Sequence, residues 1–319
     1  MAGAGPGRLV GRKAARAPQV RTEPLAVRLA LIAVATLFLG LFVILPIAAV
    51  LHQAFSKGWD VYLAAVQDPA ARAAIELTVT VALIAVPLNL VFGVAASWAI
   101  ARFRFPGRAL LLTLIDLPFA VSPVISGMVF VLLFGAHGVL GPFLAEHDIK
   151  VIFALPGIVL ATIFVTFPFV ARELIPVMEA QGAEEEEAAI VLGASGWQMF
   201  WWVTLPKIKW GLLYGVILCN ARAMGEFGAV SVVSGHIRGR TNTMPLHVEI
   251  LYNEYNYAAA FAVASLLLLL AFATLGAKRL VEHRARQAEL AVAIAPAAPA
   301  TPGEPTPPTA TLVLPETTP

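Results

Sequence analysis

The sequence predicts an all-α polytopic membrane protein that crosses a bilayer six times. Hydrophobic residues make up 59% of the 319-residue chain and charged residues only 13%, which soluble globular domains do not show. A helix of about 20 apolar residues crosses the hydrocarbon core of a bilayer. Its backbone satisfies its own hydrogen bonds there, so long runs almost without charge indicate spanning helices.

Six such runs follow one another along the chain. They lie at residues 29–51, 77–101, 112–136, 151–171, 210–235 and 255–277. The first is longer than the apolar part of a typical signal peptide, and we expect it to be an uncleaved helix. Between the first two, residues 59–76 mix apolar and charged residues at loosely helical spacing, which predicts an interfacial helix outside the membrane. Residues 25–284 thus form the predicted membrane domain.

Basic residues predict the orientation of these six segments. Of the 22 Lys and Arg residues, 16 lie on the side that holds both termini and five on the other, while Arg222 lies inside the fifth segment. The positive-inside rule then places both termini in the cytoplasm. A net charge of +2, spread between the segments, does not suggest a nucleic-acid partner.

The two ends of the chain differ from the membrane domain in composition. Residues 1–24 are rich in Gly, Ala and Arg, and residues 285–319 are dominated by Ala, Pro and Thr. Neither end has enough apolar residues to form a core. We expect a disordered cytoplasmic leader, whose arginines lie against anionic lipid headgroups, and a disordered cytoplasmic tail.

The third segment carries Asp116, Pro118 and Pro123 near its cytoplasmic end. Because proline removes a helical hydrogen bond, these prolines predict a kink. Broken backbone at membrane depth usually lines a path enclosed by protein, which makes Asp116 a candidate for the translocation path. The alternative is that Asp116 lies at the inner interface, where carboxylates are less costly.

The fifth segment contains Arg222 and Glu226, four residues apart on one predicted helical face. Burying either charge alone in a bilayer is costly, so we expect an ion pair. A further hypothesis is that Arg222 faces the translocation path and offsets the charge of a passing oxyanion. Gly225 and Gly228 beside the pair allow close helix contact or a break in the helix.

Residues 182–206, between the fourth and fifth segments, predict two short helices at an angle. Glutamates at 184–187 begin the first, where they complement the helix dipole. Gly193 ends it in a left-handed conformation, and Ser195 begins the second with a capping box to Gln198. We expect Pro206 to close this second helix before the fifth segment.

Several side chains of this loop suggest that it docks another protein. The small residues Ala188 and Ala189 would let a partner surface come close, and Met199, Phe200 and Val203 would need cover, as in helix-in-groove recognition. The four consecutive glutamates could also be merely a solvated face. That alternative accounts for neither the alanine pair nor the spacing that follows it.

The same loop resembles the EAA signature of ABC importer permeases. The matching residues are Glu187, Ala188, Ala189, Gly193, Val203, Leu205 and Pro206, with Val203 in place of the usual isoleucine. The resemblance implies a type I ABC importer permease fold, and a pair of permeases in which each docks one subunit of an ATPase dimer through this loop.

Other stretches resemble the sulfate and thiosulfate permeases among these proteins, in particular their CysW-type subunit. They are residues 105–108, 116–123, 172–177, 193–200 and 221–231. Trp201 and Trp202 depart from the pattern, since basic residues are common there in relatives. The resemblance implies import of sulfate or thiosulfate, delivered by a periplasmic binding protein, through a heterodimer with a second, related permease. Molybdate or tungstate permeases are the nearest alternative.

No stretch of the chain matches a P-loop, so we expect ATP and Mg²⁺ to be bound by a separate ATPase. No cofactor, metal site or catalytic residue is predicted, because His236 and His247 lack neighbouring ligands and no nucleophile stands beside a base. The chain alone is therefore not expected to be an enzyme. An ion-coupled secondary transporter is a weaker alternative, since no internal repeat is evident.

Overall fold

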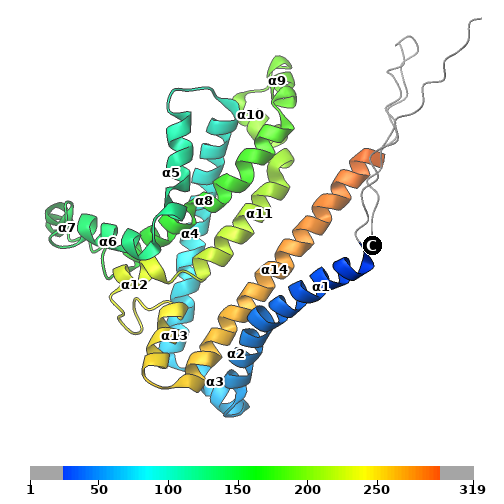
Figure 1. Cartoon of the computed structure of the whole chain (residues 1–319). Helices are drawn as coiled ribbons and strands as arrows, with labels where there is room; N and C mark the ends of the chain where they lie inside the picture. The colour runs from blue at the N-terminus through cyan, green and yellow to red at the C-terminus, as the bar shows by residue number, and fades with distance from the viewer. Residues whose placement is uncertain (1–23, 295–319) are drawn as a thin grey trace, which may run out of the picture. The chain divides into compact units, whose positions relative to one another are not determined.

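The computed structural model describes residues 24–294, and every regular element in this range is a helix (Figure 1). The predicted leader, apart from Pro24, and the predicted tail beyond Ile294 lie outside the described residues. The last helix continues to Ile294, so residues 285–294, which were expected to belong to a disordered tail, are helical.

The chain divides into two compact units, residues 1–52 and 53–319. In the described part of the first unit, α1 (Leu25–Leu39), the π-helical turn η1 (Gly40–Ile44) and the start of α2 (Leu45–Phe55) follow one another without a break. The residues of α1 and η1 are all at least partly exposed, and most of them are apolar. Such a helix, hydrophobic all round, is suited to contact with lipid or with other spanning helices.

The second unit holds the remaining helices. In chain order they are α3 (Trp59–Gln67), α4 (Pro69–Arg102), α5 (Arg108–Ala120), α6 (Pro123–Phe134), α7 (Gly141–Glu146), α8 (Leu155–Gln181), α9 (Glu184–Val191), α10 (Gly196–Met199), η2 (Phe200–Thr204), α11 (Leu205–Met224), α12 (Gly228–Ser234), α13 (Met244–Asn253) and α14 (Tyr257–Ile294). Among them, η2 is a π-helical turn.

Six stretches of the described chain could cross a membrane, in agreement with the number predicted. Four are helices that are long and apolar enough by themselves: Leu25–Phe55, Pro69–Arg102, Leu155–Gln181 and Tyr257–Arg284. The other two are bent pairs. The α5 and α6 axes meet at 108°, and the helix that ends at Met224 meets α12 at 50°.

The start of α4 differs from the expected interfacial helix over residues 59–76. That stretch is divided at Asp68, whose carboxylate accepts hydrogen bonds from the backbone N–H groups of Ala70 (2.8 Å) and Ala71 (3.3 Å). Asp68 is therefore an N-cap, and Pro69 occupies the first helical position, where its missing N–H costs nothing. Only α3 remains as a separate helix, and residues 69–76 belong to α4.

The contact between α4 and α8 forms the centre of the second unit. Small residues allow the two helices to approach closely: a Cβ added to Gly93 would lie 2.6 Å from Cγ1 of Val170. A few buried polar groups join the helices within this apolar contact. Asn89 donates to Oγ1 of Thr166 at 2.7 Å, and Ser97 donates to the carbonyl of Ala171 at 3.3 Å. Small residues and interhelical hydrogen bonds are the usual means of helix association in lipid.

The two bent pairs contact each other through their shorter arms. A Cβ on Gly127 of α6 would lie 2.7 Å from the carbonyl oxygen of Ala229 in α12, and one on Gly228 would lie 2.9 Å from Cβ of Pro123. The predicted break in the third segment is present between α5 and α6. Pro118 lies inside α5, whereas Pro123 begins α6.

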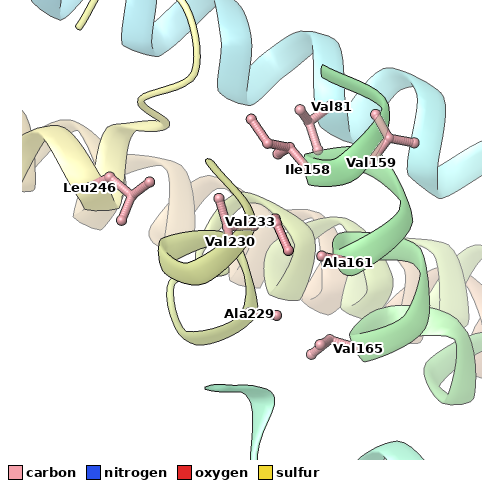
Figure 2. Close-up of a cluster of buried hydrophobic side chains, with 9 residues drawn as sticks. All are labelled: Val81, Ile158, Val159, Ala161, Val165, Ala229, Val230, Val233 and Leu246. Atoms are coloured by element: carbon pink, nitrogen blue, oxygen red, sulfur yellow. The ribbon is translucent and has the colours of Figure 1, made fainter. Parts of the chain in front are cut away.

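A cluster of buried aliphatic side chains holds these short arms against the long helices. Val230 and Val233 of α12 pack with Ile158 of α8, Val81 of α4 and Leu246 of α13 (Figure 2). All five are at most 2% exposed. One apolar core therefore joins α4, α8 and the consecutive helices α12 and α13, at the end of the second unit that lies away from α9 (Figure 1).

Substitution of Gly93 tests the close contact between α4 and α8. We expect Gly93→Ala to lower stability by about 1–3 kcal/mol, because the added methyl group overlaps Val170 and forces a shift. The matched control is Gly276→Ala in α14, where an added Cβ meets nothing within 4 Å and alanine favours the helix. Thermal unfolding of the detergent-purified protein measures both. Equal midpoints for the two variants would contradict the proposed close contact.

Candidate functional site

The loop from Gln181 to Pro206 contains the short helices α9 and α10, as the sequence predicts. Gly193, with φ of +95°, follows α9 and takes the left-handed conformation expected of it. Ser195 begins α10 with a complete capping box, in which its Oγ accepts from Gln198 N–H (3.3 Å) while the Gln198 side chain accepts from Ser195 N–H (2.9 Å).

The expectation that Pro206 closes the second helix is wrong. Helix α10, η2 and α11 form one continuous helix from Gly196 to Met224. The π-helical turn explains this continuity: the N–H of Leu205 bonds to the carbonyl of Phe200, five residues back. A π-turn widens the helix locally, and Pro206 lies in the first turn that follows it, where a missing N–H and a proline ring are tolerated.

The residues of the predicted signature lie mostly at the surface of the second unit. Glu187, Ala188, Gly193 and Pro206 are exposed, and Ala189, Val203 and Leu205 are half-buried. Figure 1 shows α9 and α10 at the end of the unit where α4 passes into α5. This exposure leaves the signature residues available to another protein.

The apolar residues that need cover are not the ones that the sequence suggested. Met199 is 6% exposed because the chain itself covers it, and Phe200 packs against Trp98 of α4 with ring centroids 5.5 Å apart. Instead, Val191, Leu192 and Trp202 are 80–88% exposed. These three side chains form the apolar part of the candidate docking surface, together with Ala188.

One of the four glutamates at the start of α9 is buried, which the sequence analysis missed. The Glu186 side chain is 7% exposed and forms an ion pair with Arg102 at the end of α4, with 2.7 Å between Oε2 and Nε. The two residues are 84 positions apart, so no local spacing reveals the pair. The other three glutamates are exposed. A solvated face therefore describes Glu184, Glu185 and Glu187 but not Glu186.

The expected ion pair of Arg222 and Glu226 is present, with 2.5 Å between Nη1 and Oε2. The pair does not lie along one continuous helical face as expected, because α11 ends at Met224 and Glu226 occupies the break before α12. Glu226 is 1% exposed in its side chain and Arg222 33%. Oε1 of Glu226 also accepts from the N–H of Ala229 at 3.0 Å, so this carboxylate stabilises the break itself.

Asp116 lies within α5 and pairs with Arg172 of α8, with 2.8 Å between Oδ1 and Nε. The guanidinium of Arg172 also lies over the ring of Phe119, 4.9 Å from its centroid. Both charged side chains are about half-exposed. Asp116 is eight residues from the first residue of α5, hence about 12 Å along the helix from its start.

Residues 89–287 match the family described as "Binding-protein-dependent transport system inner membrane component". The chain belongs to this family. The matched range begins within α4 and ends within α14.

Several permeases of sulfate transport systems are similar in sequence to most of this chain. "Sulfate transport system permease protein CysW" of Synechocystis sp. is 55% identical over 81% of this chain and 94% of its own length. The protein of the same name in Escherichia coli is 55% identical over 81% and 89%. "Sulfate transport system permease protein CysT" of Escherichia coli is 40% identical over 73% and 84%.

The fold is that of ABC importer permeases. A chain of a bacterial ABC transporter involved in the import of alginate superposes with a TM-score of 0.68 at 18% identity, over 82% of this chain and 96% of that one. A second structure, of an alginate ABC transporter in complex with an alginate-bound periplasmic protein, superposes with a TM-score of 0.67, at 18% identity, over 82% and 94%. The predicted all-α permease fold is confirmed.

Among residues 24–294, no group of three or more His, Cys, Asp or Glu residues is arranged to hold a metal ion. The single cysteine, Cys219, is buried and free.

The segment between α12 and α13 carries a further polar cluster, at the end opposite to α9. Arg238 forms an ion pair with Glu254, and the N–H of Met244 bonds to Oγ1 of Thr78 in α4 at 2.8 Å. His247 of α13 is 3% exposed. Burial lowers the pKa of its imidazole, the nearby carboxylates of Asp68 and Glu254 oppose that shift, and Arg238 adds to it.

The lowered pKa of His247 predicts a pH-dependent stability. The unfolded chain binds the proton of His247 more readily than the folded chain. The free energy of unfolding is therefore highest at pH values above the ordinary histidine pKa of about 6.5, and it decreases as the pH falls below that value. The thermal midpoint of the wild type should therefore decrease between pH 7 and pH 5. We expect this decrease to be smaller in His247→Gln by about 2–4 °C, which corresponds to about 1 kcal/mol of unfolding free energy. Identical pH profiles of the wild type and the variant in detergent would refute this prediction.

Proposed function

We propose that this chain is the permease subunit of an ATP-driven importer that moves sulfate or thiosulfate across the inner membrane. The observation that carries the proposal is the 55% identity to the CysW sulfate permease over 94% of that protein's length. The same identity favours sulfate over the molybdate or tungstate alternative. Since sulfate and molybdate are both tetrahedral dianions, the permease need not distinguish them, and the periplasmic binding protein would select between them.

A separate ATPase supplies the energy in this proposal. Its subunits bind ATP and Mg²⁺, and one of them docks on the exposed surface of α9 and α10. The residues proposed for coupling are Glu187, Ala188, Ala189, Gly193, Val203, Leu205 and Pro206. The exposed side chains of Val191, Leu192 and Trp202 support this assignment, because a small apolar surface on a short exposed helix suits a groove in a partner.

Two further protein partners complete the importer. The similarity to CysW and CysT of Escherichia coli, two permeases of the sulfate transport system, supports a heterodimer with a second permease. The neighbouring structure that contains a periplasmic protein supports delivery of the anion by a binding protein. Docking of an ATPase on α9 would place that end of the second unit in the cytoplasm, the side on which the basic residues predict both termini.

Two ion pairs are proposed for the translocation path. Arg222 is one-third exposed beside the buried Glu226, so part of its guanidinium is available to an anion. Asp116 holds Arg172 in a half-exposed pair, which must face water or the second permease because lipid does not solvate charge. In this proposal Arg222, Glu226 and Asp116 set the charge of the path. The net charge of each pair is zero, which lets a dianion pass without being retained.

Transport of radiolabelled sulfate in a strain that lacks this chain tests the function. Loss of sulfate uptake, restored by the plasmid-borne gene, is the expected result, and molybdate uptake in the same cells is expected to be unchanged. Intact sulfate uptake with lost molybdate uptake would overturn the sulfate assignment. A strain that takes up both anions normally would overturn the importer assignment.

The pair of Arg222 and Glu226 gives a test of the path. Arg222→Gln leaves Glu226 buried without its partner, a change that costs about 3–5 kcal/mol, and we expect little protein in the membrane. Arg222→Gln/Glu226→Gln removes both charges, so normal amounts of protein are expected, with sulfate uptake reduced about tenfold or more if Arg222 meets the anion. Immunoblots of membranes measure the amount of protein. Normal uptake by the double variant would exclude a role in the path.

A further inference from the structure

Glu186 connects α9 to three other parts of the second unit. Its two carboxylate oxygens accept from the guanidinium of Arg102, Oε2 from Nε at 2.7 Å and Oε1 from Nη2 at 3.1 Å. Oε1 also accepts from the hydroxyl of Thr204, in η2, at 2.9 Å. The remaining Nη1 of Arg102 donates to the carbonyl of Met178 in α8 at 2.7 Å.

This arrangement is rigid as well as buried. A guanidinium that binds both oxygens of a carboxylate fixes the relative orientation of the two groups, which a single hydrogen bond does not. The side chains of Arg102 and Glu186 are 9% and 7% exposed, so water does not compete for them. Thr204 is 1% exposed. The carboxylate of Glu186 thus holds the ends of α4 and α8, and the π-turn η2, in one geometry.

The backbone on either side of α9 provides no comparable constraint. Gly182 precedes the helix with φ of +65° and Gly193 follows it with φ of +95°, and an added Cβ at either position meets nothing within 4 Å. The backbone of glycine adopts more conformations than that of any other residue. Rotation at Gly182 and Gly193 would therefore absorb a displacement of α9 before it reached α8 or α10. The other ion pair of α9, from Glu185 to Lys207, has a carboxylate that is 65% exposed, and exposed pairs contribute little.

We infer that the buried ion pair of Glu186 and Arg102, with Thr204, is the joint through which movement of α9 reaches the membrane helices. The inference rests on the proposed function, because it assigns the positioning residues of the coupling loop. When the ATPase moves α9, Glu186 displaces Arg102, and with it the ends of α4 and α8. The coupling residues from Glu187 to Pro206 bind the ATPase, while the buried pair transmits its motion.

The test separates docking from transmission in the complete complex. Glu186→Gln keeps the size of the side chain but removes the charge, and Glu184→Gln is the matched control, since Glu184 begins the same helix and is exposed. Both variants are purified with the ATPase and the second permease and reconstituted in proteoliposomes. The measurements are co-purification of the ATPase, basal ATP hydrolysis, hydrolysis stimulated by the sulfate-loaded binding protein, and sulfate uptake.

Glu186→Gln leaves Arg102 buried without its partner, so we expect less complex in the membrane. Per amount of purified permease, co-purification of the ATPase and basal hydrolysis are expected to be normal. Stimulated hydrolysis and sulfate uptake are expected to fall about tenfold or more, because one partner of a buried ion pair has lost its charge. Arg102→Lys retains the charge without the paired donors and is expected to show an intermediate loss. The control should behave as the wild type.

Two outcomes would overturn the inference. One is stimulated hydrolysis and uptake by Glu186→Gln equal to those of Glu184→Gln. The other is a loss of all four measurements in proportion, which would indicate a role only in folding or assembly. Absence of sulfate uptake by the wild-type complex would instead contradict the proposed function. Because it is measured on the wild type, this outcome is distinguishable from a failure of the inference, which concerns only the variants.

Discussion

The close contact of α4 with α8 is the constraint on which the rest of the second unit depends. Between helices surrounded by lipid there is no hydrophobic driving force, so association relies on close packing and on hydrogen bonds. Gly93 supplies the closeness, because its missing Cβ leaves room for Val170. Asn89 and Ser97 supply hydrogen bonds to α8. At the ends of the same two helices, Arg102 donates to the carbonyl of Met178 and to the carboxylate of Glu186 in α9.

The two broken spans complement this rigid centre. Each consists of a longer arm and a shorter arm that meet at an angle. The shorter arms pack on each other through Gly127 and Gly228. Ending a helix inside the membrane leaves backbone groups without partners, which only protein contacts can satisfy there. Glu226 meets part of that need at the second break by accepting from the N–H of Ala229.

Hydropathy, turn residues and caps predicted much of this fold, because each depends on neighbouring residues. The six segments, the break near Pro123 and the capping box at Ser195 are of this kind. The N-cap and proline at Asp68 were equally local signals, and the sequence analysis overlooked them. The burial of Glu186 and the pairing of Asp116 with Arg172 depend on helices that meet only in the folded chain. No pattern within one segment distinguishes Glu186 from the exposed glutamates beside it.

The π-turn at Phe200–Thr204 changes the direction in which the side chains of the following helix point. An α-helix turns by about 100° per residue, so the one additional residue of a π-turn rotates every later side chain by about that angle. Trp202 therefore points outward while Thr204 points inward to Glu186. The same rotation sets the direction of Arg222, at the far end of the continuous helix. A single residue gained or lost within Phe200–Thr204 would thus reorient the charge of Arg222, which lies near the end of the same continuous helix.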